Sequence, residues 1–143
     1  MAQKVINILL VEDDEVDIMN VKRAFKKVNI TNPIYVANNG VEALTMLRGE
    51  DNQPPLFPPE RRLILLDLNM PKMGGIEFLQ EIRSDSQLRT TPVVVMTTSN
   101  QDQDRVEAYN LNVAGYILKP VTFASFVEMM AALNRYWVLC ELP

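Results

Sequence analysis

Acidic, hydroxyl and lysine side chains follow short apolar segments at several points of this 143-residue sequence. Glu12 and Asp13 come directly after ILLV, Asp67 follows LILL, Thr97 closes VVVMT, and Lys119 follows YIL. Converging carboxylates repel one another, and oxygen-only ligands favour a hard divalent cation, Mg²⁺ or alternatively Mn²⁺. An aspartate beside such a cation, with a lysine and a threonine opposite, is suited to attack a phosphoryl group. We therefore expect phosphoryl-transfer chemistry that depends on positioning and charge neutralisation.

Asp67 is the candidate nucleophile because it ends a wholly apolar segment, where burial penalises an unpaired carboxylate. Lys119 could neutralise one phosphoryl oxygen, and Thr97 could donate a hydrogen bond to another. Each feature also has an ordinary structural explanation. The acids at 12–15 could line the first turn of a helix, Lys119 could belong to a simple turn, and residues 97–99 could cap a helix. The chemical interpretation requires all these segments to end at one place.

The elements that would position these side chains are five apolar segments that alternate with five helical ones. Alternation of this kind predicts βαβ units, and hence a doubly wound α/β domain with a parallel sheet and helices on both faces. Ligands of such domains bind beyond the carboxyl ends of the strands, where the polar side chains would lie. The predicted strands are 5–11, 34–37, 63–67, 92–97 and 115–118, and the helices cover about 18–28, 39–47, from 76, 102–110 and from 122.

Composition excludes several other classes of protein. The chain is 48% hydrophobic and 22% charged, as globular proteins are, and its net charge of −4 argues against direct binding of nucleic acid. It contains no histidine, which excludes Ser-His-Asp triads and histidine-ligated zinc. Its single cysteine, Cys140, allows no internal disulfide, and we interpret it as a small apolar residue. No segment resembles a signal peptide or a membrane span, so we expect a cytoplasmic protein with no membrane partner.

Four segments of the sequence match a known pattern: ILLVEDDE at 8–15, LLDLNMPKMGG at 65–75, PVVVMTTS at 92–99 and GYILKP at 115–120. LLDLNMP followed downstream by KP is a specific combination, whereas VEDD alone is a weak one. Together the segments resemble the receiver domain of bacterial two-component response regulators, the chemotaxis-type family. The resemblance covers about residues 5–133 and implies the flavodoxin-like strand order 2-1-3-4-5.

The resemblance implies a role for each matched position. Asp67 would accept a phosphoryl group from a phosphohistidine of a sensor histidine kinase, and Lys119 would bind a phosphoryl oxygen. Thr97 and Tyr116 would form a switch pair that changes the surface of helix four, strand five and helix five. The family also implies a cis bond between Lys119 and Pro120. Mg²⁺ would be held by Asp13, Asp67, the backbone carbonyl of Asn69 and, indirectly, Glu12.

Several features resemble the stand-alone receivers that partner phytochrome kinases of cyanobacteria and bacteria. These are a Pro-rich loop at 50–60 and a last helix with its tail at 122–143, continuing through RYWVLCELP. We expect one receiver domain over 1–143, a homodimer, and a phytochrome as the possible kinase. The stripe at 123, 126, 130, 133 and 137 is expected to face the core. We interpret Gly75 as the backbone turn after Met73.

Three other functions are consistent with parts of the pattern. A Mg²⁺-dependent phosphatase could use a transient aspartyl phosphate, but it would normally need a second acid soon after Asp67, and the next three residues are Leu68, Asn69 and Met70. A flavodoxin-like binding module would need a phosphate loop after the first strand, where EDDE would instead repel phosphate. A degenerate receiver is disfavoured because no matched active position is substituted.

Overall fold

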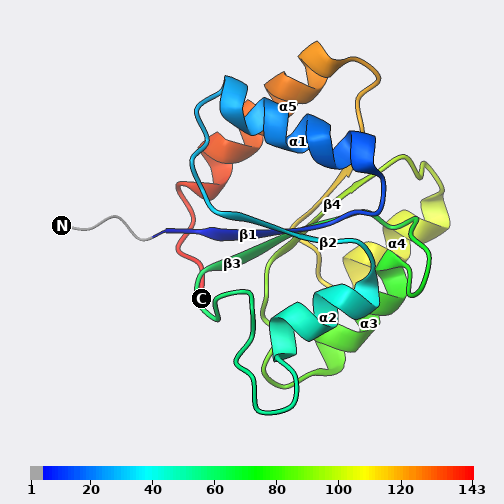
Figure 1. The fold of residues 1–143 in the computed structure, drawn as a ribbon. Coiled ribbons are helices and arrows are strands. Elements are labelled where there is room, and N and C mark those ends of the chain that lie inside the picture. The colour runs from blue at the N-terminus through cyan, green and yellow to red at the C-terminus, as the bar shows by residue number, and fades with distance from the viewer. Residues whose placement is uncertain (1–4) are drawn as a thin grey trace.

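A five-stranded parallel sheet with the order β2-β1-β3-β4-β5 forms the centre of the computed structural model, which describes residues 5–143 (Figure 1). The predicted doubly wound fold and its strand order are therefore confirmed. The first four residues of the expected 1–143 domain lie outside the described part. The strands are β1 (Asn7–Val11), β2 (Ile34–Ala37), β3 (Arg62–Leu66), β4 (Val93–Thr97) and β5 (Gly115–Leu118).

The three central strands are mainly apolar because both of their faces are covered. Every residue of β1, β3 and β4 is buried, as expected for parallel strands between two layers of helices. β1 pairs with both β2 and β3, and β3 pairs in turn with β4. The edge strands β2 and β5 are only partly buried. This register brings the carboxyl ends of β1, β3, β4 and β5 to the same edge of the sheet.

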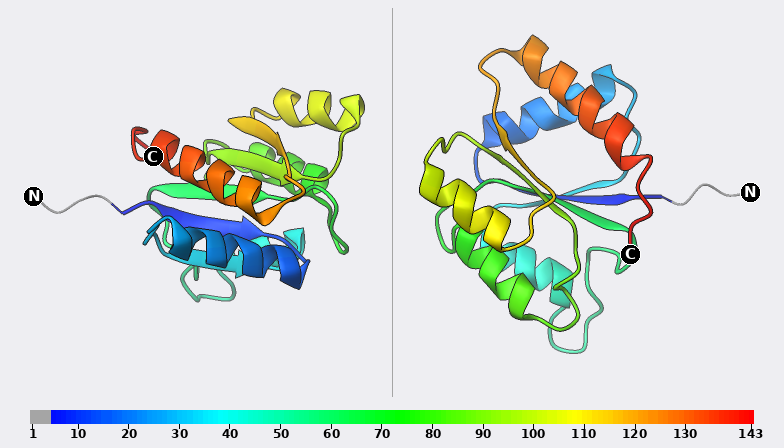
Figure 2. Two further views of the ribbon diagram at one scale, coloured as in Figure 1. Left: turned by 90° about the horizontal axis from the view of Figure 1, so that it is seen from above. Right: turned by 180° about the vertical axis from the view of Figure 1, so that it is seen from behind.

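Helices cover the sheet on both faces, in two separate apolar clusters. α1 and α5 lie together on one face, and α2, α3 and α4 lie on the other (Figures 1 and 2). Side-chain caps begin three of these helices. Asp14 caps the first, Asn39 accepts a hydrogen bond from the N–H of Glu42, and Thr122 accepts one from the N–H of Ser125. The helices are α1 (Glu15–Lys27), α2 (Gly40–Arg48), α3 (Gly75–Ser84), α4 (Asp102–Asn110) and α5 (Phe123–Trp137).

The last helix ends at Trp137, so its expected continuation through RYWVLCELP is wrong. The N–H groups of Leu139 and Cys140 bond carbonyls three residues back, which tightens the chain into a turn. The carbonyl of Pro143 then accepts the N–H of Arg61 at 2.7 Å, and this ties the tail to the start of β3. The predicted core stripe is confirmed, with three buried members and two partly buried ones: Phe126, Met130 and Trp137, then Phe123 and Leu133.

The Pro-rich loop at 50–60 contains no helix or strand, as predicted, and it is anchored to the core. Phe57 is fully buried and packs edge-on against Tyr35, with ring centroids 5.2 Å apart. The buried guanidinium of Arg62 donates to the carbonyls of Leu47, Phe57 and Pro58. Among residues 5–143, no helix is both long enough and apolar enough to cross a membrane.

Candidate functional site

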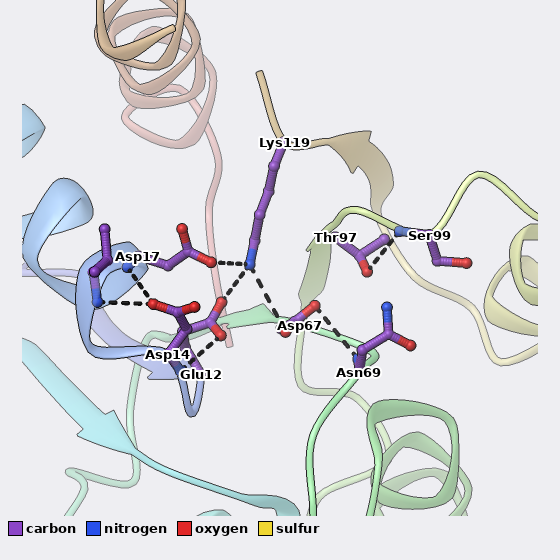
Figure 3. Close-up of polar contacts among 9 residues, drawn as sticks. Glu12, Asp14, Asp17, Asp67, Asn69, Thr97, Ser99 and Lys119 are labelled. Atoms are coloured by element: carbon purple, nitrogen blue, oxygen red, sulfur yellow. Dashed lines mark hydrogen bonds and ion pairs between the residues drawn. The ribbon is translucent and has the colours of Figure 1, made fainter. Parts of the chain in front are cut away.

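The side chains selected from the sequence meet at the carboxyl edge of the sheet (Figure 3). Glu12 directly follows β1, Asp67 follows β3, Thr97 ends β4, and Lys119 follows β5. Asp13 comes one residue after Glu12. The parallel register explains this convergence, because the strands that carry these residues end side by side.

Three acids form what we call the acidic cluster: Glu12, Asp13 and Asp67. One carboxylate oxygen from each lies within 4.8 Å of the others. Glu12 and Asp67 are buried, whereas Asp13 is exposed. The donors are all oxygens and one side is open to solvent, which fits a hard cation such as Mg²⁺ that keeps several waters. The arrangement is costly without a counter-charge, because two buried carboxylates face each other.

Lys119 supplies part of that counter-charge from the other side of the cluster. Its ammonium Nζ lies 2.6 Å from Oε2 of Glu12, 2.7 Å from Oδ2 of Asp17 and 3.7 Å from Oδ2 of Asp67. Burial alone would lower the pKa of Lys119, but the hydrogen bonds that its ammonium donates to Asp17 and Glu12 outweigh this effect, so the pKa is raised. The lysine is therefore a permanent cation pointing into the acidic cluster.

Glu12 carries the most perturbed carboxyl group of the site. Burial raises the pKa of Glu12 from 4.5 to about 7; the negative charge of Asp67 adds to this, and the bond from Lys119 opposes it. One side-chain oxygen of Glu12 also accepts the N–H of Asp14 at 3.2 Å, which fixes the carboxyl against the start of α1. Near neutral pH the cluster can thus hold a proton on Glu12 in place of a metal charge.

Asp17 belongs to this site, although the sequence motifs did not predict it. It lies in the first turn of α1, where Asp14 caps the helix by accepting the N–H groups of Val16 and Asp17. The structural explanation given for the acids at the start of the helix is thereby confirmed for Asp14. Asp13 precedes the Asp14 cap and lies outside α1, whereas Asp17 lies in the first turn of the helix. An acid so soon after Glu12 and Asp13 was the available signal that it could reach the same site.

The other predicted site residues are Thr97, Asn69 and Tyr116. In the described part of the chain, neither hydroxyl group among them forms a hydrogen bond with the carboxylate of Asp67. Thr97 is fully buried, and its hydroxyl oxygen accepts the N–H of Ser99 at 3.2 Å; among residues 5–143 no hydrogen bond joins it to Asp67. The N–H of Asn69 is 3.4 Å from Oδ1 of Asp67. Tyr116 is half-buried, and its hydroxyl donates to the carbonyl of Ser99 at 3.0 Å. Ser99 thus contacts both members of the expected switch pair.

Comparison with known proteins decides the family. The family model for the response regulator receiver domain matches residues 8–131, which include every site residue described above. The chain belongs to this family. Receiver domains are signalling proteins of two-component systems, and the resemblance read from the four motifs is confirmed.

This receiver is similar to several named response regulators and to solved structures of phytochrome response regulators. The probable methanogenesis regulatory protein FilR2 of Methanothrix harundinacea is 37% identical over 92% of this chain and 83% of its own length. Response regulator Rcp1 of Synechocystis is 34% identical over 92% of this chain and 88% of its own. The structure of phosphorylated RcpA, a cyanobacterial phytochrome response regulator, matches with a TM-score of 0.85 at 34% identity, covering 98% of this chain and 99% of that one. The Mn²⁺-bound form of Rcp1 gives 0.82 at 34%, covering 95% and 97%.

Two backbone expectations for this receiver are wrong. No peptide bond among residues 5–143 is cis, so the bond between Lys119 and Pro120 is trans. Gly75 is not the turn: Lys72 and Met73 adopt the left-handed conformation, with φ of 51° and 80°. Gly75 is required by a close approach instead, since a Cβ there would lie 2.6 Å from the carbonyl oxygen of Asp67.

Proposed function

We propose that this receiver is the phosphoacceptor protein of a two-component system and takes a phosphoryl group from a sensor histidine kinase onto Asp67. The observation that supports this most directly is the position of Asp67. Its carboxylate is buried, shares the acidic cluster with Glu12 and Asp13, and lies 3.7 Å from the ammonium of Lys119. A buried carboxylate beside a fixed cation, at an edge that a ligand can reach, is suited to act as a nucleophile.

The transfer is an exchange of one bond to phosphorus for another. A carboxylate oxygen of Asp67 attacks the phosphorus of the phosphohistidine, an O–P bond forms, the N–P bond breaks, and the imidazole leaves with the electron pair. Lys119 neutralises one phosphoryl oxygen, and the Thr97 hydroxyl donates to another after releasing the Ser99 N–H. Asp13, Asp67 and the carbonyl of Asn69, with Glu12 acting indirectly, would hold Mg²⁺ or Mn²⁺, which would offset the negative charge of the phosphoryl oxygens.

The same residues provide a route for the signal. An aspartyl phosphate adds roughly −1.5 to −2 charges to a site already rich in carboxylates. Thr97 and Lys119 are drawn toward that charge, and Thr97 then loses its bond with Ser99, whose carbonyl holds Tyr116. We propose that this shift changes the surface formed by α4, β5 and α5, where a protein partner would bind. Four apolar side chains are already exposed on this surface: Val106, Tyr109, Leu118 and Val121.

The proposed partner is a sensor histidine kinase, and phytochrome kinases are the first class to test. This is supported by the likeness to RcpA, described as a phytochrome response regulator. The likeness to FilR2 supports a different input, because that relative is described as a methanogenesis regulatory protein. We also propose that the protein is a stand-alone receiver, because these relatives have similar lengths. We propose further that it is a homodimer, because apolar side chains are exposed at and just beyond the end of α5: Tyr136, Val138 and Leu139.

Intact-protein mass spectrometry after incubation with acetyl phosphate tests the chemistry. We expect one added phosphoryl group that requires Mg²⁺ and is absent from Asp67→Asn. The matched control is Asp85→Asn, which alters a partly buried aspartate that is bonded to Arg48 outside the acidic cluster, and it should leave the adduct intact. Rapid hydrolysis of the donor that depends on Asp67, without an adduct, would favour the phosphatase alternative. No adduct and no hydrolysis would refute phosphotransfer.

A further inference from the structure

The ammonium of Lys119 is divided unequally among three carboxylates. It makes short bonds of 2.6 and 2.7 Å to Glu12 and Asp17, whereas Asp67 lies 3.7 Å away, beyond hydrogen-bond distance (Figure 3). An ammonium has three donors, and two of them are engaged by residues other than the proposed phosphoacceptor. Lys119 is therefore held toward α1 and β1 while Asp67 carries no phosphoryl group.

We infer that Asp17 is a positioning residue which competes with Asp67 for Lys119 and so keeps the unphosphorylated receiver in its resting state. The inference rests on the proposed function, since it concerns how Lys119 reaches a phosphoryl group on Asp67. In the resting state Asp17 withholds the ammonium. When Asp67 is phosphorylated, the larger negative charge draws Lys119 away, and the bond to Asp17 breaks.

The position of Asp17 allows its bond to Lys119 to form readily and to break at low cost. Its backbone N–H is bonded to the side chain of Asp14, the cap of α1, so the carboxylate is presented from a fixed helical turn. Its side chain is 34% exposed, compared with 8% for Asp67 and 3% for Glu12. Water can therefore hydrate Asp17 when Lys119 leaves, whereas an equally buried acid would be left unpaired at a high cost.

The exposure of Asp17 also sets the size of the effect. Ion pairs that remain open to solvent contribute on the order of 1 kcal/mol or less, because water screens them. Removing the charge of Asp17 should therefore favour the phosphorylated form by about fivefold. A much larger change would require a buried pair, which is not what the geometry provides.

The experiment compares Asp17→Asn with Glu15→Gln in the full chain. Glu15 is an exposed acid in the same first turn, and it is not among the three carboxylates near Lys119. Both changes remove one negative charge from the start of α1, so they act alike on the helix dipole and on long-range fields. With Mg²⁺ present, we expect Asp17→Asn to bind beryllium fluoride, a phosphoryl mimic, about fivefold more tightly than wild type. Glu15→Gln should match wild type, and Asp17→Glu should restore the wild-type affinity.

A second measurement follows the ammonium itself, by NMR of the Lys119 side chain in the metal-free protein. We expect the change Asp67→Asn to shift the Nζ resonance more in the Asp17→Asn background than in wild type, because Lys119 then turns to Asp67. Equal shifts in the two backgrounds, or an Asp17→Asn affinity equal to that of Glu15→Gln, would overturn the inference and leave the proposed function standing. If no form of the protein binds beryllium fluoride or accepts a phosphoryl group, the proposed function fails, and the inference fails with it.

Discussion

The raised pKa of Glu12 predicts that the metal-free protein loses stability as the pH rises. Folding shifts this pKa from 4.5 to about 7, so the native state binds the proton more tightly than the unfolded chain. Between those two pH values the free energy of unfolding falls by up to about 1.4 kcal/mol per pH unit. The stabilising contribution is fully present below pH 4.5 and is lost as the pH rises through 7, in total roughly 3 kcal/mol. The side chain of Glu12 is only 3% exposed, so solvent screening reduces this little.

The assay is urea denaturation in EDTA at a series of pH values from 5 to 8, for wild type, Glu12→Gln and Glu15→Gln. Gln at position 12 keeps the shape of the protonated carboxyl group and cannot ionise. We therefore expect the wild type and Glu15→Gln to lose stability together across this range, while Glu12→Gln changes little and is the most stable of the three at pH 8. Parallel curves for all three proteins would refute the reasoning, because they would show that Glu12 is not the group whose proton is lost.

Three further predictions concern the metal, the loop and the end of β3. Because Mg²⁺ must displace the proton from the acidic cluster, its affinity should rise with pH up to about 7, with proton release measurable by titration calorimetry in buffers of different ionisation enthalpy. Phe57→Ala should cost about 3–5 kcal/mol in urea denaturation, because it empties a fully buried site. Gly75→Ala should slow phosphorylation by acetyl phosphate and lower stability, since the new Cβ would meet the Asp67 carbonyl at 2.6 Å; Gly115→Ala, whose nearest neighbour would be 3.9 Å away, should be mild.

The fold could be predicted because each strand is short, apolar and bounded by clear signals. The five predicted strands and the five observed ones agree to within two residues at each end. The β1 and β3 segments could be recognised because both faces of the sheet are covered, so each contains four consecutive apolar residues directly before Glu12 or Asp67. Periodicity placed α1 and α5 on the sheet for the same reason, through one apolar stripe on each helix.

The convergence of the site residues could also be predicted, because a parallel sheet brings its carboxyl ends together whatever the loops do. What could not be predicted is how Lys119 is shared. Sequence spacing brings it to the same edge as Glu12 and Asp67, but it does not show that the flexible side chain places its ammonium 2.6 Å from Glu12 and 3.7 Å from Asp67. Asp17 was missed because an acid in the first turn of a helix has an adequate explanation in the helix dipole alone.

The wrong expectations concern backbone detail, where several conformations suit one sequence. Two adjacent glycines suggested that Gly75 makes the turn, yet Lys72 and Met73 take the left-handed conformation, and Gly75 instead relieves a close contact with Asp67. The last helix has helix-forming residues beyond Trp137, but the bond between Pro143 and Arg61 draws the tail away. Tertiary contacts of this kind override local preference.

The charges of the site account for its resting state and for its response together. Three carboxylates face a single ammonium, and two of those carboxylates are buried, so the metal-free site reduces its negative charge by holding a proton on Glu12. A divalent cation in the acidic cluster would release that proton, and Glu12 would then hold Lys119 more strongly on its side. A phosphoryl group on Asp67 must therefore attract Lys119 against Glu12 as well as Asp17. The weaker, solvent-exposed bond to Asp17 is the one that can break at little cost, which makes Asp17, rather than Glu12, the residue that sets how readily this receiver responds.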